Sequence, residues 1–290
     1  LNLGLRWDYF DPAAMFHASI SDELTLQDSI FLYKNLQEAK PKHMLAPRVS
    51  VSYPITDQGT IRFSYGHFYQ IGSLSSLYTN SVFRAPPGTN PTFGNANVQP
   101  QRSVQYELGL QQGLTPDLKV EITGYYKDVR DYIFYQTVIT PRGDRQYRLL
   151  TNLAYANTRG LSFSLTKRRA LGEWLSASID YTFQVADGNR TQPTDELFYS
   201  EQKGRLSETY LVAQDFDRSH TVTSTVMITD PGDWVVSMIG YLRTGTPYTP
   251  SFPSNGVPIQ FVQNSDRQPA QWNVDLKAEK FFTFGGLRTS

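Results

Sequence analysis

Apolar and polar residues alternate along most of this chain, and this period of two limits the possible folds more than any other feature. Residues 1–9 carry leucines and aromatic rings at the odd positions, while the even positions are polar or glycine. This alternation is typical of a β-strand with one apolar face. It recurs in segments 48–53, 61–66, 103–110, 118–123, 161–166, 175–183, 221–228 and 272–279, and more weakly in 235–241. The pattern predicts about ten strands and no amphipathic helix.

The connections between these strands alternate between short and long. The short turns, rich in Gly, Pro and Asp, are 54–59, 113–117, 168–173 and 230–233. The long polar connections are roughly 11–43, 71–100, 137–150, 187–216 and 245–268. Outer-membrane β-barrels have this asymmetry, with short turns at one rim and long loops at the other. Long connections of this kind are uncommon inside a compact soluble domain.

Strand length also favours a membrane barrel. Stretches such as 102–112, 174–185 and 219–229 have the roughly 9–11 residues that a tilted membrane strand needs. The mean hydropathy of −0.42 fits a barrel, because only alternate strand residues face lipid. No apolar run approaches the roughly 18 residues of a membrane-spanning helix. We predict an all-β fold: an antiparallel transmembrane β-barrel segment of about ten long strands. A soluble β-sandwich is the alternative fold.

Aromatic residues gather where strands meet turns or loops. Trp174 and Trp234 each follow a short turn, while Trp7 and Trp272 lie in strands near long connections. Indole rings are favoured at membrane interfaces because one edge is apolar and the N–H is polar. We therefore predict all four tryptophans at the membrane interfaces. Further aromatics expected in the outer girdle are Tyr9, Phe10, Phe68, Tyr69, Tyr181, Phe183 and Tyr241.

Charge and cysteine content narrow the possible partners. The formal net charge is zero, which argues against nucleic acid as the main partner because phosphate binding needs clustered cations. The one basic cluster, 167–169, lies in a short turn, where a solvated turn is the simpler interpretation. The chain has no cysteine, so disulfides and thiolate metal sites are excluded.

Catalytic and metal-binding patterns are weak. Asp215, Asp217, Ser219 and His220 have the residue types of a hydrolytic triad, but neighbours on an extended strand point to opposite faces. The segment 187–189 offers oxygen ligands for Ca²⁺ without the spacing of a full loop motif. We expect a polar rim and a turn in these two places, with no catalytic residue, metal or cofactor. Recognition residues are expected in the long loops, with Arg84, Phe93, Tyr199 and Tyr248 as candidates.

Several segments resemble one family in the order in which that family has them. Residues 3–9 (LGLRWDY), 46–50 (APRVS), 97–101 (NVQPQ) and 125–133 (YYKDVRDYI) are similar to barrel strands of TonB-dependent receptors. Residues 157–161 (NTRGL) are similar to another such strand, with Leu161 in place of the usual acidic residue. Residues 243–248 (RTGTPY) resemble a segment of the Oar-like subgroup.

This resemblance implies a place within a larger protein. Family members have a 22-stranded barrel, an N-terminal plug and a TonB box. We expect residues 1–290 to be part of one barrel domain, without the plug or the terminal strands. The implied role is the barrel wall of a bacterial outer-membrane transporter that imports a scarce solute. The implied partners are outer-membrane lipid, the plug of the same full-length chain and the TonB complex.

Other functions remain open at this point. A passive porin or a surface adhesin uses the same barrel without plug or TonB box. An outer-membrane enzyme needs His, Ser and Asp residues converging at the outer rim. The sequence does not distinguish a siderophore, an oligosaccharide or a peptide as the transported solute.

Overall fold

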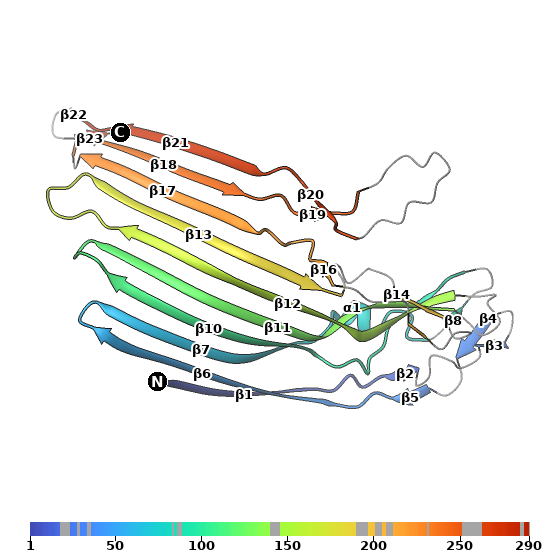
Figure 1. Ribbon diagram of the computed structural model, residues 1–290. Helices are drawn as coiled ribbons and strands as arrows, with labels where there is room; N and C mark the ends of the chain where they lie inside the picture. The colour runs from blue at the N-terminus through green and yellow to red at the C-terminus, as the bar shows by residue number, and fades with distance from the viewer. Residues whose placement is uncertain are drawn as a thin grey trace.

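Ten long strands form one continuous antiparallel sheet in the computed structural model (Figure 1). The structure describes residues 1–290 except 18–23, 28–29, 34–35, 83, 86–88, 140–145, 190–196, 201–204, 207–210, 231, 251–262, 285–286 and 290. The sheet order is β1 (Asn2–Phe10), β6 (Lys42–Thr56), β7 (Gly59–Gln70), β10 (Gln101–Gly113), β11 (Leu118–Ile139), β12 (Gln146–Lys167), β13 (Leu175–Gly188), β17 (His220–Asp230), β18 (Trp234–Arg243) and β21 (Gln271–Lys280). Each long strand pairs with its neighbour along the chain, as the prediction of an antiparallel barrel segment requires.

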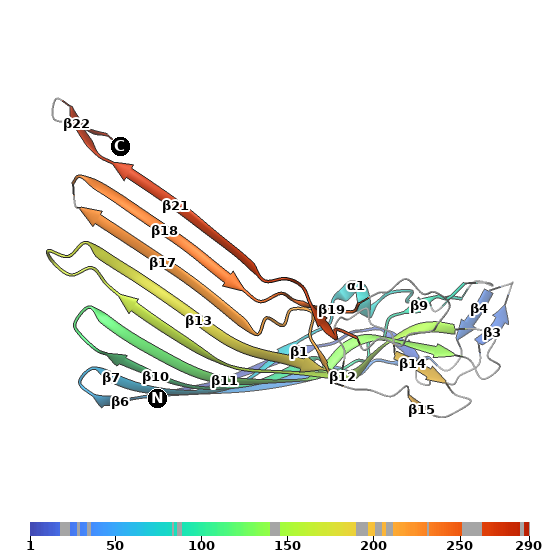
Figure 2. The same ribbon diagram turned by 45° about the horizontal axis from the view of Figure 1, so that its top comes forward.

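The predicted asymmetry of the connections is confirmed. Figures 1 and 2 show tight turns at one end of the sheet and extended loops at the other. The turn between β6 and β7 contains only two residues, Asp57 and Gln58. Gly172 and Gly232, with φ of 81° and 101°, occupy the left-handed region in two other tight turns. Within the described residues β1 pairs only with β6 and β21 only with β18, so the sheet is open and curved.

The loop end carries short elements. They are β2 (Met15–His17), β3 (Leu24–Gln27), β4 (Ile30–Tyr33), β5 (Leu36–Glu38), α1 (Leu74–Leu77), β8 (Arg84–Ala85), β9 (Thr92–Phe93), β14 (Leu197–Ser200), β15 (Arg205–Leu206), β16 (Val212–Ala213), β19 (Pro247–Tyr248) and β20 (Asp266–Arg267). The strands β22 (Phe282–Phe284) and β23 (Leu287–Thr289) form a hairpin at the turn end. No helix among the described residues is long and apolar enough to cross a membrane.

One predicted connection was wrong. Residues 137–150 were expected to form a long loop, but β11 runs to Ile139 and β12 begins at Gln146. The two strands stay paired from Leu118↔Lys167 to Ile139↔Gln146, with register shifts around Asp131. Asp131 has a φ of 57°, which is the conformation of a bulged residue. The bulge lets the hairpin bend away from the main sheet and continue into the loop region (Figure 2).

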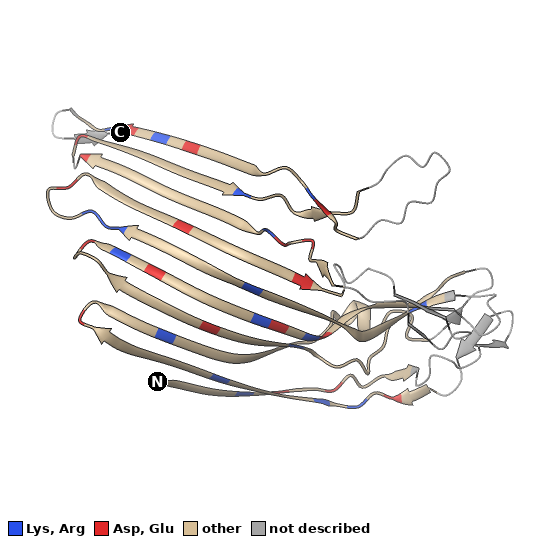
Figure 3. Cartoon of the chain, in the orientation of Figure 1, with Lys and Arg blue, Asp and Glu red and all other residues tan. Residues whose placement is uncertain are grey.

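Cross-strand register separates an apolar face from a polar face. Leu3↔Val49, Phe63↔Leu108 and Leu161↔Phe183 bring apolar partners together. Ser50↔Ser64 and Ser162↔Thr182 do the same for polar ones. Lysine, arginine and acidic residues are spread among uncharged residues along the strands (Figure 3). The alternation of the sequence therefore becomes two continuous surfaces.

The apolar face has no covering layer. Leu3, Leu5 and Leu276 are 67%, 71% and 72% exposed, whereas a sandwich would bury such a face against a second sheet. A transmembrane barrel turns this face toward lipid, which takes the place of a protein core. The β-sandwich alternative is therefore not supported.

The buried residues gather at the base of the loops. Leu77, Val98 and Leu150 form a core cluster in which Phe10 and Ile133 are also packed. Asn97 fixes this region to β6, since Lys42 Nζ donates to Asn97 O at 2.9 Å and to Asn97 Oδ1 at 2.8 Å. The sheet is thus held by its ladders and the loop end by a small conventional core.

The girdle positions predicted for Phe10, Phe68 and Tyr241 were wrong. Phe10 packs against the core cluster that contains Leu77, and Phe68 lies against Arg48 on the polar face. Tyr241 also lies on the polar face. Its cross-strand partners are Thr223 and Asn273, which lie on the polar face, and its ring receives the Arg243 guanidinium at 4.4 Å. Both faces of β18 contain apolar residues, so alternation alone did not fix its orientation. Tyr181 and Phe183 lie on the apolar face, beside His220.

Candidate functional site on the polar face

Two polar side chains extend across neighbouring strands beside glycines of the polar face. The Arg62 guanidinium from β7 passes over β10 and forms an ion pair with Glu121 on β11. Gly109 is the β10 residue between them, and a Cβ at this position would lie 3.6 Å from Arg62 Nη2. This is an ordinary van der Waals distance, and the closer neighbour of such a Cβ would be Thr123 Oγ1, at 3.0 Å.

Tyr125 uses the same arrangement one step further along the sheet. It lies opposite Gly160 on β12, and its hydroxyl donates to Gln184 Oε1 on β13 at 3.2 Å. A Cβ at Gly160 would lie 2.6 Å from Tyr125 Oη and 2.2 Å from Phe183 O. The Tyr125 ring therefore needs a residue without a side chain beneath it.

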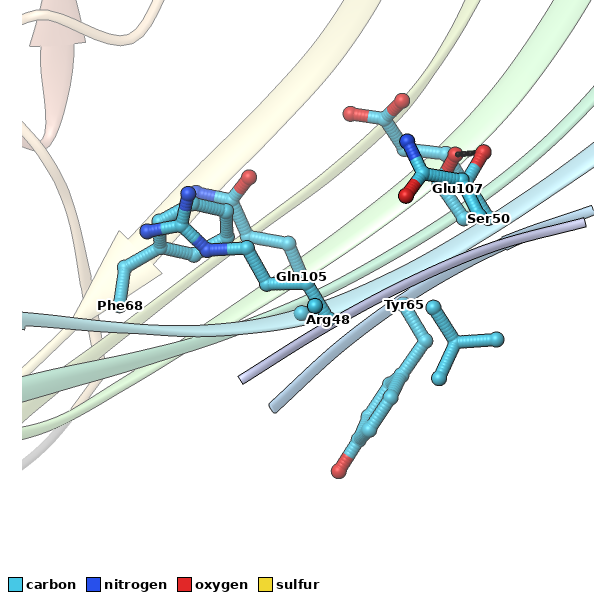
Figure 4. A pocket seen from close by; sticks show the side chains of 11 residues that line it. Arg48, Ser50, Tyr65, Phe68, Gln105 and Glu107 are labelled. Carbon is cyan, nitrogen blue, oxygen red and sulfur yellow. Dashed lines mark hydrogen bonds between the residues drawn. The ribbon is translucent and has the colours of Figure 1, made fainter. Parts of the chain in front are cut away.

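A first hollow lies over β1, β6, β7 and β10 (Figure 4). We call it the Arg48 hollow; its volume is about 350 Å³. Arg48 stacks on Phe68, with the guanidinium carbon 4.5 Å from the ring centre, and Gln105 lies beside them. Glu107 projects from the same face, whereas Tyr65 points to the opposite side of the sheet (Figure 4). The hollow thus contains one cation, one carboxylate and two amides, those of Asn2 and Gln105.

A second hollow, the Tyr125 hollow, adjoins the first and has a volume of about 450 Å³. The two share Gln105 and Glu107. Its other polar and aromatic lining residues are Gln101, Tyr125, Lys127, Tyr132, Thr158, Gln184, Gln214 and Phe216, together with Tyr106 and Tyr126, whose side chains belong to the apolar face by register. Amides and tyrosine hydroxyls both donate and accept hydrogen bonds. This surface can hold a polar solute by hydrogen bonds and stacking, with little net charge.

Beside the Tyr125 hollow, which Gln214 and Phe216 help to line, a set of contacts that we call the clasp joins the loop after β13 to the loop after β18. Asp217, 1% exposed, forms an ion pair with Arg267 and accepts a hydrogen bond from Ala186 N at 2.8 Å. Asn264 adds a second connection, donating to Asp215 Oδ1 at 2.6 Å and to Ala213 O at 2.8 Å. The loops are therefore fixed to each other at their bases.

Replacing Arg267 with Gln is expected to loosen this clasp. Asp217 would keep the Ala186 hydrogen bond but lose its cation, which costs about 1.5 kcal/mol for a bond to a charged group. We expect faster proteolysis in segment 263–268 of the folded full-length protein, with the barrel unchanged. Arg243→Gln, which removes the same charge on the sheet, is the control. Equal proteolysis in both variants and the wild type would contradict the clasp.

The four residue types that suggested a hydrolytic triad do not form one. Asp217 is engaged by Arg267, while His220 Nδ1 lies 2.9 Å from the Tyr181 hydroxyl on the apolar face. Ser219 contributes its carbonyl to Gln184 N at 3.0 Å. Asp217 and Ser219 therefore take part in the loop-to-strand junction, while His220 packs beside Tyr181.

The turn predicted at 187–189 was wrong for its first two residues, because Asp187 and Gly188 belong to β13 and pair with both β12 and β16. Asp187 pairs with Arg159 at 3.2 Å. Asn189 Oδ1 accepts from Tyr155 N at 2.8 Å, and its Nδ2 donates to Leu153 O at 3.3 Å. In the part of the chain that the structure describes, no group of three His, Asp or Glu residues is placed to hold a metal ion.

The basic cluster at the end of β12 also has acidic neighbours. Lys167 forms ion pairs with Asp117 and, at 2.5 Å, with Glu173. The Lys167 ammonium and the Thr115 hydroxyl lower the pKa of the Asp117 carboxyl to about 2. These charges join two adjacent turns at the short-turn rim.

The four loop candidates lie in different parts of the loop end. Arg84 is in β8 and Tyr199 in β14, and both side chains are outside the described set. Phe93 has no exposed surface and packs edge-on against Tyr147 at 5.6 Å, so its ring supports the loop. Tyr248 is 39% exposed and donates to Asp266 Oδ2 at 3.0 Å, and this carboxylate raises the pKa of the phenol. Phe93 lies in β9 and Tyr248 in β19, so the four candidates come from four different short strands.

The four tryptophans lie near strand ends. Trp7 and Trp272 are 61% and 73% exposed at the loop end of the apolar face. Trp234 begins β18 at the turn end, on the same face. Trp174 is also at the turn end, but it precedes Leu175 and so has the alternation of the polar face. The two turn-end tryptophans therefore lie at the same rim of the sheet, but Trp234 is on the apolar face and Trp174 is at a position that alternates with that face.

Sequence reasoning did not single out the residues that line the two hollows. Gln105 and Glu107 were identified only as the polar side of a strand, and Arg48 only as part of a motif. Their convergence depends on the register between β6, β7 and β10. The available signal was the glycines at 66, 109 and 160 in polar-face positions, where neighbouring side chains can cross.

Comparison with known proteins agrees with this architecture. A family model described as "TonB dependent receptor-like, beta-barrel" matches residues 1–288. No curated protein sequence matches the chain. Among solved structures, the outer membrane transporter YddB from Escherichia coli is 13% identical with a TM-score of 0.63, covering 86% of this chain and 36% of that chain.

Two other solved structures show the same fold. The siderophore receptor PiuA from Acinetobacter baumannii is 12% identical, with a TM-score of 0.57, and covers 96% of this chain and 34% of that one. The ferric enterobactin receptor PfeA from Pseudomonas aeruginosa, an R480A mutant in complex with enterobactin, is 16% identical, with a TM-score of 0.56 and coverages of 88% and 36%. This chain therefore spans about a third of the length of these structures.

Proposed function

The chain belongs to the TonB-dependent receptor-like β-barrel family of bacterial outer-membrane proteins, and we propose that it forms part of the wall of a transporter that imports a scarce solute. The observation that carries this proposal is the polar face, with its two adjoining hollows and the clasped pair of loops beside the Tyr125 hollow. A closed barrel turns this face toward its lumen and the apolar face toward lipid.

In this proposal residues 1–290 are part of a single barrel domain. The partners are the plug of the same full-length chain, which fills the lumen, and the TonB complex, which supplies energy. Membership of the Oar-like subgroup stays a prediction based on residues 243–248. Outer-membrane lipid contacts the apolar face, with Trp7 and Trp272 at the outer interface and Trp234 at the inner one. Trp174 stays a prediction for the inner interface.

The solute first meets the loops and then the polar face. Tyr248 is the loop candidate with a described, partly exposed side chain, and Arg84 and Tyr199 remain candidates from sequence. The hollows then offer amides, hydroxyls and the charges of Arg48, Lys127 and Glu107. The role proposed for the chain is binding and passage of the solute, without catalysis.

Depletion of a mixed medium by whole cells tests this proposal. Cells with the full-length gene and cells lacking it would be given siderophores, oligosaccharides and short peptides, and the remaining solutes measured by mass spectrometry. We expect one class to disappear only with cells that carry the gene, and a protonophore to stop its loss. Depletion that continues with the protonophore would indicate a passive pore. Equal depletion by both strains would overturn import.

A further inference from the structure

Two arginines face each other directly on the apolar side of the sheet, at its loop end. Arg102 on β10 pairs with Arg130 on β11, in the same continuous register that pairs Tyr106 with Tyr126. Residues 102, 104, 106 and 108 share one side of β10, and this side carries Leu108 toward lipid. Both guanidinium groups therefore belong to the outward face of the wall.

The described residues neutralise only part of the positive charge of Arg102 and Arg130. Arg130 Nε donates to Asp128 Oδ2 at 2.9 Å, and its guanidinium carbon lies 5.3 Å from the Tyr155 ring centre. Arg102 makes no described side-chain hydrogen bond or ion pair, and its Nε is buried without a partner. Like charges directly opposite on adjacent strands are destabilising. A single carboxylate beside two cations leaves one positive charge.

The position of the two arginines relative to the membrane can be inferred from a row of aromatic side chains on the same face. Tyr65, Tyr106 and Tyr126 stand side by side on the outward face, with ring centres 5.0 and 6.4 Å apart. Arg102 and Arg130 lie four residues further toward the loops. At about 3.3 Å per residue and a tilt of about 40°, this is about 10 Å above the row. Tyrosine belts mark the interface, so the arginines reach the headgroup layer.

We propose that Arg102 and Arg130 form a binding site for the phosphate group of an outer-leaflet lipid. A phosphate monoester between the guanidinium groups accepts hydrogen bonds from both and removes their repulsion. Arg130 still has its terminal nitrogens available, because the Asp128 bond uses Nε. The nearby Arg159 is not included, since Asp187 and Asn157 already engage it. The site requires only the outer-membrane location and is independent of what the barrel transports.

Native mass spectrometry of the full-length protein tests the site. The probe is bisphosphorylated lipid A titrated into detergent micelles, compared with the same lipid after enzymatic removal of its phosphates and with inorganic phosphate. The wild type is expected to bind the phosphorylated lipid at least about tenfold more tightly than the Arg102→Gln/Arg130→Gln variant, at roughly threefold to fivefold for each arginine. The dephosphorylated lipid is expected to bind both proteins equally weakly.

Two further variants make the result specific. Arg243→Gln removes a charge from the polar face and is expected to leave lipid binding unchanged. Arg102→Lys/Arg130→Lys keeps both charges and is expected to recover most of the affinity, which also excludes a folding defect as the cause. Wild-type binding by the double Gln variant, or equal binding of the dephosphorylated lipid, would overturn the proposal. Binding of inorganic phosphate as tight as that of the lipid would replace the lipid by a free anion and overturn it as well.

Discussion

Leu108→Arg is expected to lower the free energy of unfolding of the full-length barrel in vesicles by about 2 kcal/mol, because Leu108 lies two residues inside the interfacial row that contains Tyr106 and the cost of an arginine falls from the midplane towards the interface. Leu108 lies in the middle of β10, 55% exposed on the apolar face, with Phe63 as its partner on β7. In the membrane this position faces hydrocarbon, where an arginine loses its hydration. Denaturant titration of vesicle-bound protein, followed by the heat-dependent gel shift of folded barrels, measures the loss.

Ser64→Arg is the matched control. Ser64 lies at the same depth on β7 but faces the polar side, directly opposite Glu107. An arginine there gains an opposite charge and remains outside the hydrocarbon, so the change is expected to stay within about 0.5 kcal/mol of the wild type. A large loss in both variants, or none in either, would contradict the assignment of the faces.

Gly160→Val is expected to destabilise the barrel by about 3 kcal/mol, at the upper end of overpacking effects. The added Cβ would lie 2.2 Å from Phe183 O and 2.8 Å from Tyr125 Cζ. The ring can rotate away, but the carbonyl belongs to the ladder between β12 and β13. Either the ladder shifts or Tyr125 leaves its position beside Gln184. Thermal unfolding of the full-length protein in detergent gives the loss.

Gly124→Ala provides the comparison for this prediction. Gly124 lies on the apolar face of the neighbouring strand, and a Cβ there meets only Leu161 Cδ2, at 3.3 Å. The end of a flexible leucine can move, so little change in stability is expected. Tyr125→Ala combined with Gly160→Val is expected to recover part of the loss, because the ring no longer competes for the space. A Gly160→Val protein as stable as Gly124→Ala would contradict the close packing.

The strands and the two rims could be predicted from sequence because both signals are local. Alternation within a strand shows which residues share a face, and turn residues show where the chain reverses. Tyr241 was misplaced because β18 has apolar residues on both faces, so its local pattern was ambiguous. The extension of β11 and β12 to Ile139 and Gln146 was missed because a polar hairpin resembles a loop in composition.

The candidate site could be predicted only in part. Gln105 and Glu107 were recognisable as polar-face residues, but the sequence does not give the register that places them beside Arg48. The opposition of Arg102 and Arg130 depends on the same register. The loop candidates were chosen by residue type, which does not predict exposure: the Phe93 side chain is buried, whereas that of Tyr248 is partly exposed. Burial in a loop depends on distant segments that fold over it.

A cysteine scan along β10 tests the central claim most directly, namely that one face of the sheet meets lipid and the other the lumen. The chain contains no cysteine, so single substitutions from Ser103 to Leu110 in the full-length protein can be spin-labelled without background from this region. Electron paramagnetic resonance then compares collision with lipid-soluble oxygen and with a water-soluble nickel complex. We predict oxygen access peaking with a period of two at Val104, Tyr106, Leu108 and Leu110. A reversed phase, or equal access at all eight positions, would contradict the account.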